Sequence, residues 1–188
     1  MKLLLIIFVF EFVSIHGYAQ IYSSDNISVH FFAPAPITYI DALTNNAHGF
    51  IDTKKKEVKI SMDMISFNFK KALMQQHFNE HYMETEKYPT ASFKGNFKEE
   101  LNLDRDGSYT INLEGKFNIH GVEKNKILPC TIIVKDGKAM INANFNLISK
   151  DYKIKLPQIL YKPIAEEVNV SVNGLLNKVV AFKKLAKN

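Results

Sequence analysis

The sequence has 188 residues, of which 46% are hydrophobic and 23% are charged, and its formal net charge is +5. These values are typical of one globular domain with a real core, and they exclude a disordered or membrane-embedded chain. Arg105 is the single arginine and the lysines are scattered, so the dense basic stripe of a nucleic-acid-binding protein is absent. We therefore expect no nucleic-acid partner.

Residues 1–19 have the features of a secretory signal peptide. A basic residue precedes an apolar stretch from Leu3 to Phe10, and Gly17 and Ala19 form a small-x-small cleavage pattern. The alternative is an uncleaved membrane anchor, but Glu11 interrupts a stretch that is already shorter than the ~20 residues of a span. We expect cleavage after Ala19, export to the periplasm or out of the cell, and no stable membrane insertion.

The first strands follow the signal segment. NISVHF (residues 26–31) and EVKISMDM (residues 57–64) alternate apolar and polar residues with the period of a β-strand. In the next stretch, ISFNF (residues 65–69), the apolar residues have the opposite parity. We therefore predict a bulge or bend near Met64–Ser66.

Residues 69–84 predict one helical insertion among the strands, because they contain neither proline nor glycine. Met74, Phe78 and Tyr82 are spaced i, i+4 and i+8, which places them on one helix face. Tyr88-Pro89 then returns the chain to extended geometry.

The same segment contains HFNEH, which matches the H-x-x-E-H signature of inverted zinc peptidases. A helix would place His77 and His81 on one face, but a catalytic zinc needs a third protein ligand, and no motif marks one. The sequence also lacks a G-x-S-x-G elbow and a phosphate-binding glycine loop. We expect no cofactor, no metal and no enzymatic activity, and keep a metal-dependent hydrolase that uses His77 and His81 as a remote alternative.

Five later stretches predict further strands, and residues typical of turns lie between several of them. The stretches are residues 91–97, 109–121, 127–134, 139–149 and 167–176. Gly115 lies in the middle of the longest one, on its apolar side, and predicts a sharp bend or a close approach of two backbones. ILPCTIIV is apolar on both faces apart from Thr131, so we expect a cover on both sides. We expect Cys130, which lies in this stretch, to be a buried and inert thiol. It is the single cysteine of the sequence, so no cysteine follows the signal segment to accept a lipid anchor, and we do not expect a lipoprotein.

About eight short strands with one apolar face each predict a mainly β fold, either a closed barrel or a sandwich. No linker or internal repeat divides the chain. We expect one domain over residues 20–176 and a basic C-terminal tail over residues 177–188.

The middle of the chain resembles the YceI-like family. The resemblance is carried by EKYPTASFKG (residues 86–95) and YTINLEGKFNIHGVEKNKILPCTIIV (residues 109–134), and it extends from about Ile21 to Leu176. The family pattern is an aromatic residue followed by proline, an aromatic-centred strand, and a G-x-L-x-I-x-G-V-T-K strand that leads into an apolar strand.

Several departures indicate a divergent member of that family. Phe117 stands where the family usually has leucine, and Glu123 stands where it usually has threonine. The chain has no tryptophan, and MQQHF replaces the family's R-D-x-H-L, with His77 in the place of the histidine.

The resemblance implies an exported, extended antiparallel barrel of the lipocalin-like type, in which some members hold a long isoprenoid chain in an apolar tunnel. A barrel of about eight strands is near the size that either fills itself with side chains or holds one slender ligand. Seven residues share the faces expected to line such a tunnel: Phe67, Phe93, Phe97, Leu113, Phe117, Phe145 and Leu147.

Two functions remain open at this point. The first is an exported protein that sequesters or carries an apolar small molecule, an isoprenoid or another lipid, inside the barrel. The alternative is a filled barrel that acts through its surface as a stress-related or partner-binding envelope protein. The sequence leaves the oligomeric state open, with a homodimer as one option.

Overall fold

The computed structural model describes residues 21–34, 39–155, 158–159, 162–163 and 166–179. The predicted signal segment and its cleavage point after Ala19 lie outside these residues. The last strand ends at Lys178, so it includes the first two residues of the predicted tail, and the rest of that tail beyond Val179 also lies outside.

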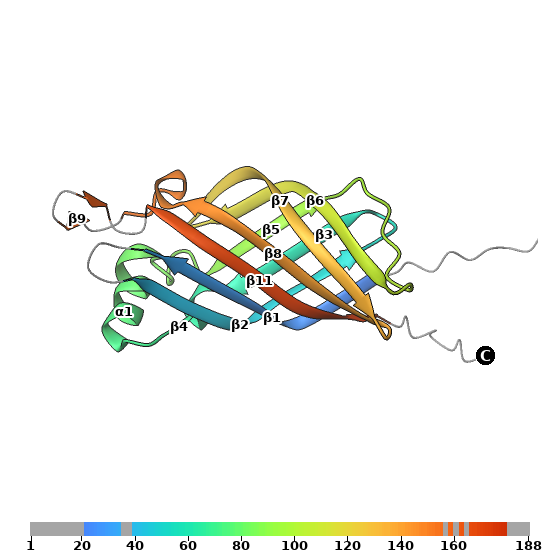
Figure 1. Cartoon of the computed structure of the whole chain (residues 1–188). Helices are drawn as coiled ribbons and strands as arrows, with labels where there is room; N and C mark the ends of the chain where they lie inside the picture. Colours follow the sequence, from blue (N-terminus) through green and yellow to red (C-terminus); the bar gives the residue numbers. More distant parts are fainter. Residues whose placement is uncertain (1–20, 35–38, 156–157, 160–161, 164–165, 180–188) are drawn as a thin grey trace, which may run out of the picture.

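Eight long strands form a closed antiparallel barrel, shown from the side in Figure 1. In the order of the sheet they are β1 (Ile21–Ala33), β11 (Glu167–Lys178), β8 (Lys138–Ile148), β7 (Val122–Lys135), β6 (Gly107–Ile119), β5 (Thr90–Asn96), β3 (Glu57–Asp63) and β2 (Ile40–Asp52). β1 also pairs with β2, so the sheet closes on itself. The predicted extended antiparallel barrel of about eight strands is therefore confirmed.

The helical insertion lies between β3 and β5. It consists of α1 (Ala72–His77) and a π-helical turn (Phe78–Tyr82), and it covers the end of the barrel seen on the left of Figure 1. The short strand β4 (Asn68–Phe69) leads into it and pairs with β2. Two further short strands, β9 (Gln158–Ile159) and β10 (Lys162–Pro163), pair with each other near the same end.

The change of parity after β3 corresponds to a 3-10 turn at Met64–Ser66, so the predicted bend is confirmed. The turn rotates the chain by enough to bury Met62, Met64 and Phe67 together, although their spacing fits no single strand. Thr44 of β2 holds the turn in place, because its hydroxyl hydrogen-bonds to that of Ser66 at 2.8 Å.

The close backbone approach predicted at Gly115 is also present. Gly115 of β6 lies opposite Gly95 of β5, and a Cβ on Gly115 would overlap the backbone of Lys94 and Gly95. A Cβ on Gly95 would lie 2.6 Å from the ring of Phe93. Gly115 therefore allows the two backbones to approach closely, and Gly95 leaves room for the ring of Phe93.

The expected cover on both faces of ILPCTIIV is wrong. Leu128, Cys130 and Ile132 point into the barrel and are buried, whereas Ile127 and Ile133 are 66% and 42% exposed. The strand is β7 of a closed barrel, and no described segment forms a second layer outside it. Its outer face is apolar but uncovered.

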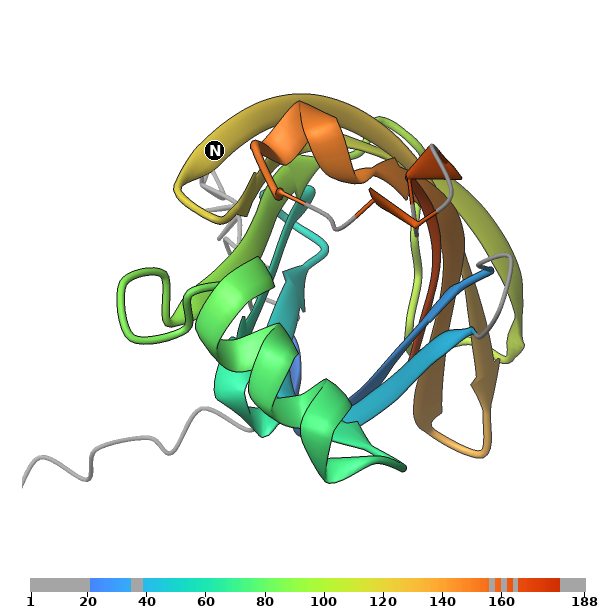
Figure 2. The ribbon, with the colours of Figure 1, turned by 90° about the vertical axis from the view of Figure 1, so that its left-hand side faces the viewer.

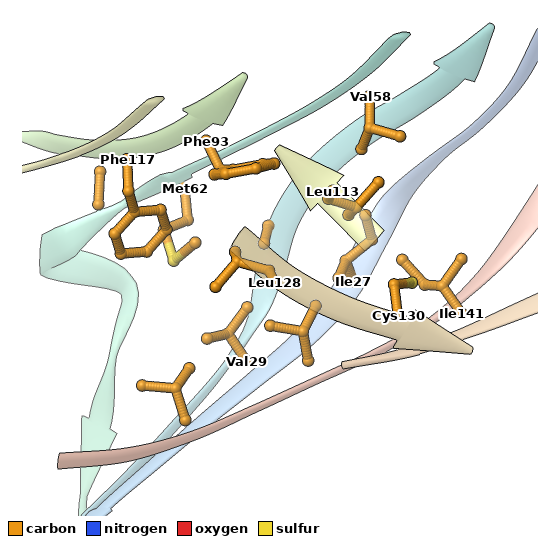
Figure 3. Close-up of a cluster of buried hydrophobic side chains, with 14 of the residues drawn as sticks. Ile27, Val29, Val58, Met62, Phe93, Leu113, Phe117, Leu128, Cys130 and Ile141 are labelled. Atoms are coloured by element: carbon orange, nitrogen blue, oxygen red, sulfur yellow. The ribbon is translucent and has the colours of Figure 1, made fainter. Parts of the chain in front are cut away.

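The interior of the barrel has a packed half away from α1. Its largest fully buried side chains are Tyr22, Ile27, Leu103, Ile111, Ile132 and Leu176. Figure 3 shows part of the transition, with Ile27, Cys130 and Ile141 toward this half and Met62 and Phe117 further along. Among the described residues, no helix is long and apolar enough to cross a membrane.

Candidate functional site: an apolar cavity under the helix

A cavity of about 470 Å³ occupies the other half of the barrel. Figure 2 looks into this end of the barrel, with α1 along the lower left of its rim and the 3-10 helix Ser149–Tyr152 at the top. The volume falls within the range of about 300–1,000 Å³ that is common for small-molecule sites. The interior of the barrel is therefore filled at one end and hollow at the other.

Six of the seven residues expected to line a tunnel lie on the wall of this cavity: Phe67, Phe93, Leu113, Phe117, Phe145 and Leu147. Phe97 is buried as well, at 3% exposed, but it belongs to the packed half and is not on the wall. It follows the end of β5, where its N–H donates to the carbonyl of Lys56 at 3.0 Å. Strand parity predicted the face of Phe97, but it contains no information about position along the barrel.

Four methionines of the wall were not among the lining residues that the sequence predicted. Met62, Met64, Met74 and Met83 all line the cavity. Methionine side chains are unbranched and polarizable, so they adapt to irregular apolar shapes. A wall with four of them can adjust to the outline of a flexible apolar molecule.

The helix face predicted from the sequence is the cover of the cavity. Met74, Phe78 and Tyr82 all line it, whereas Leu73, which precedes them, is 62% exposed. The i, i+4, i+8 spacing was the available signal. What it could not show is that this face rests over a hollow barrel.

Phe78 attaches the cover to the barrel through an aromatic cluster. Its ring centroid lies 5.5 Å from that of Phe31, 4.9 Å from that of Phe69 and 5.9 Å from that of Phe67. Such pairs contribute about 0.5–1.5 kcal/mol each beyond the area that they bury. The same rings line the cavity, so the cluster also forms part of its wall.

Gln75 makes a second attachment, with hydrogen bonds. Its side-chain amide donates to the carbonyl of Phe67 at 2.6 Å, and its carbonyl oxygen accepts from the N–H of Phe69 at 3.1 Å. The side chain thus pairs with the extended backbone before α1 in the way a neighbouring strand would. The first turn of the helix is tied directly to the rim of the barrel.

His120 joins three segments on the opposite rim. It is 8% exposed, and its Nδ1 donates to the carbonyl of Tyr152 at 3.1 Å while its Nε2 lies 3.0 Å from a carboxylate oxygen of Glu84. His120 and Glu84 both have positive φ, at 52° and 44°, a conformation that non-glycine residues seldom adopt. The surrounding contacts hold the loop after the π turn, the β6–β7 turn and the 3-10 helix together.

The wall contains no permanently charged side chain. None of its lining residues is a lysine, an arginine, an aspartate or a glutamate, and its polar groups are those of His77, Tyr82, Ser149 and Tyr152. A charged group inside would lose its hydration without gaining a partner, which is strongly unfavourable. The cavity therefore suits a neutral, mainly apolar molecule.

The H-x-x-E-H segment lies at the edge of this cavity, with His77 on the wall and the side chain of His81 63% exposed. Their ring centroids are 5.5 Å apart. Within the described residues, no group of three or more histidine, cysteine, aspartate or glutamate side chains is arranged to hold a metal ion. The third ligand that a catalytic zinc needs is thus missing from the described part of the chain.

A closed eight-strand barrel with an apolar cavity under one helix belongs to the class of small barrels whose interior has room for a single small molecule. The chain belongs to the YceI-like family, since the model of the YceI-like domain matches residues 25–175. No curated protein matches the sequence.

Three solved structures have a similar fold. A polyisoprenoid-binding domain from Saccharophagus degradans, implicated in plant cell wall breakdown, has 12% identity and a TM-score of 0.71, with 86% of this chain and 99% of that one covered. BcnA from Burkholderia cenocepacia has 14% identity and a TM-score of 0.65, with 80% and 95% covered. A YCEI protein from Campylobacter jejuni has 17% identity and a TM-score of 0.58, with 78% and 89% covered.

Proposed function

We propose that this protein binds one apolar molecule, an isoprenoid or another lipid, inside the barrel and acts as a carrier or sequestering protein. The observation that carries the proposal is the cavity of about 470 Å³ with an apolar wall that contains no lysine, arginine, aspartate or glutamate. The similarity in fold to a polyisoprenoid-binding domain supports it. No step of the proposed function is a chemical reaction.

The energetics of burial are sufficient for such a function. Each methylene group removed from water contributes about 0.8 kcal/mol, so a chain of several isoprene units can bind with few polar contacts. The cavity wall is largely preformed by strands, which limits the entropy lost on binding. The helix cover encloses the ligand and reduces its contact with water.

The N-terminal segment supports export as part of the same proposal. Its apolar stretch and small-x-small pattern are those of a secretory signal. A carrier of this kind would work in the periplasm or outside the cell, where apolar molecules must cross water between membranes or surfaces.

The alternative of a filled barrel acting through its surface fits the structure less well. It requires side chains to fill the interior, and only the half away from α1 is filled in this way.

A binding titration tests the proposal. The protein is purified without detergent, stripped of bound lipid by unfolding and refolding, and titrated with the neutral fluorophore N-phenylnaphthylamine. We expect saturable binding at one site per chain and displacement by the isoprenoid alcohol farnesol. Absence of saturable binding would contradict the proposal.

Two variants locate the binding site in the same assay. Ala91→Phe places a ring in the cavity and should abolish binding, since Ala91 is a buried wall residue. Ala72→Phe adds the same ring at an exposed position of α1 and serves as the control. Equal binding by both variants would place the fluorophore elsewhere.

A further inference from the structure

One hydroxyl group of the cavity wall has no hydrogen-bond partner among the residues that the structure describes. Tyr152 is fully buried, at 0% exposed, and lines the cavity, yet its Oη makes no hydrogen bond within the described part of the protein. The other buried side-chain oxygen without a partner there is Oδ1 of Asn79, and Asn79 is not on the wall. The hydroxyl without a partner thus belongs to a residue of the cavity wall, and a ligand oxygen reaches it by displacing neighbouring side chains of the wall.

The position of Tyr152 is well defined. Tyr152 is the last residue of the 3-10 helix on the rim, and its backbone carbonyl accepts the hydrogen bond from Nδ1 of His120. Its ring packs edge-on against Phe117, with the ring centroids 6.2 Å apart. The hydroxyl is thus attached to a fixed ring and cannot turn outward to find water.

The remaining polar groups of the wall, unlike the Tyr152 hydroxyl, have access to a hydrogen-bond partner. His77 and Tyr82 are partly exposed and can bond to water, and Ser149 already has an interaction partner. Burial, followed by the nearby charge of Asp151, raises the pKa of Tyr152 to about 12. The hydroxyl therefore keeps its proton at physiological pH and can act as a donor.

We propose that the Tyr152 hydroxyl donates a hydrogen bond to a neutral oxygen, a carbonyl or a hydroxyl, of the bound lipid. The site then prefers an oxygen-bearing isoprenoid or lipid to the hydrocarbon of the same shape. The oxygen is neutral because the wall holds neither a lysine nor an arginine to balance an anionic head group. This inference rests on the proposed function and specifies its ligand class.

A matched pair of ligands tests the inference. Farnesol and farnesene share one isoprenoid skeleton and differ by the hydroxyl group. Each competes with N-phenylnaphthylamine for the wild-type protein and for Tyr152→Phe, which removes the donor and keeps the ring. We expect wild type to bind farnesol about tenfold more tightly than farnesene, the effect of one hydrogen bond to a buried, otherwise unpaired group.

Tyr152→Phe should remove this preference by weakening farnesol binding about tenfold and leaving farnesene binding unchanged. The control is Tyr109→Phe, because the Tyr109 hydroxyl bonds to the carbonyl of Arg105 and the residue is not on the wall. It should keep the wild-type preference.

The possible failures are distinct. If farnesol and farnesene bind wild type equally well, or if Tyr152→Phe keeps the preference, the inference is overturned and the proposed function stands. If neither ligand displaces the fluorophore and no other apolar molecule does, the proposed function fails as well.

Discussion

Two buried tyrosines at opposite ends of the barrel show how much one hydroxyl depends on its surroundings. In the packed half, the hydroxyl of Tyr22 donates to a carboxylate oxygen of Asp104 at 2.7 Å, and Lys178 contacts the same oxygen. Burial and this bond raise the pKa of Tyr22. At the cavity, the hydroxyl of Tyr152 has no such partner among the described residues. The hydroxyl of Tyr22 is thus satisfied within the fold, whereas that of Tyr152 is the one that we propose a ligand satisfies.

This contrast predicts opposite effects of the same substitution on stability. Tyr22→Phe should lower the free energy of unfolding by about 1.5–3 kcal/mol, because it breaks a buried hydrogen bond to a charged group. Tyr152→Phe should leave the lipid-free protein as stable as wild type or more stable, because it removes an unsatisfied group. Urea denaturation of the lipid-free proteins measures both. A Tyr152→Phe protein that is destabilised as much as Tyr22→Phe would mean that the Tyr152 hydroxyl has a partner.

Cys130 gives a prediction about pH. Burial raises the pKa of its thiol from about 9 to about 11, and it is 5% exposed. The native state therefore holds the thiol proton more tightly than the unfolded state does. Its contribution to stability is complete below about pH 9 and is lost as the pH rises through about 11.

We expect the free energy of unfolding of wild type to fall between pH 9 and 11 more steeply than that of Cys130→Ala, which lacks this group. Denaturant titrations of both proteins at several pH values in this interval give the slope of the free energy of unfolding against pH for each. The loss of the Cys130 side chain lowers stability by the same amount at every pH, so it does not affect the comparison of the slopes. Rapid reaction of the native thiol with a thiol reagent at pH 8, or equal slopes, would contradict the buried, protonated thiol.

At the scale of the elements, we expect the helix cover to control how a ligand enters and leaves the cavity. Gln75 ties α1 to the rim through two hydrogen bonds to the backbone of Phe67 and Phe69. Gln76, the next residue, is exposed and bonds to Glu80 of its own helical segment. The two neighbouring glutamines thus differ in whether they attach the cover to the barrel.

Gln75→Leu should loosen the cover and increase the dissociation rate of N-phenylnaphthylamine several-fold, because two hydrogen bonds of about 1 kcal/mol each are lost. Gln76→Leu should leave this rate within a factor of two of wild type, since only an exposed bond of the segment is removed. Stopped-flow displacement with excess farnesol measures the rates. If both variants release the fluorophore at the wild-type rate, ligand exchange does not depend on this attachment.

The elements also show how far the sequence could predict the structure. Parity identified the inner face of every strand that carries a predicted lining residue, because a closed barrel has one dry side and one wet side. It failed for the outer face of β7, where Ile127 and Ile133 are exposed, because an apolar residue in a strand does not require a cover. It also could not separate Phe97 from Phe93, since two residues of one face can lie in different halves of the barrel.

The buried face of the helical segment could also be predicted from the periodicity of its apolar residues, but the residues that it packs against could not. The spacing of Met74, Phe78 and Tyr82 defined a buried face. The partners of that face are Phe31, Phe67 and Phe69, which no local pattern connects to it. Tyr152, the ligand contact that we propose, could not be identified either, because an unsatisfied hydroxyl is a property of the three-dimensional environment.

At the scale of the whole molecule, the interior of the barrel has two halves. One half is packed with side chains that stabilise the fold, and the other contains the cavity. Ala139 of β8 is fully buried in the first half, and Ala91 of β5 is buried on the wall of the second. The same enlargement of either side chain should therefore have different consequences.

Ala139→Phe should lower the free energy of unfolding by about 1–3 kcal/mol, because a packed interior has no room for a ring. Ala91→Phe should change it by less than about 1 kcal/mol, because the ring enters the cavity. Thermal or urea denaturation of the lipid-free proteins compares them. Equal destabilisation of the two variants would show that both halves are filled.

The central claim is that the hollow half of the barrel is where an apolar ligand binds, and a crystal of the protein soaked with hexadecyl bromide tests it most directly. The anomalous signal of bromine reports the position of the ligand independently of the shape of its chain. We predict a bromine peak inside the barrel at the α1 end, enclosed by Phe93, Leu113 and Phe117. A peak found only on the outer apolar residues, such as Ile133 and Met140, or no peak at all, would contradict the claim.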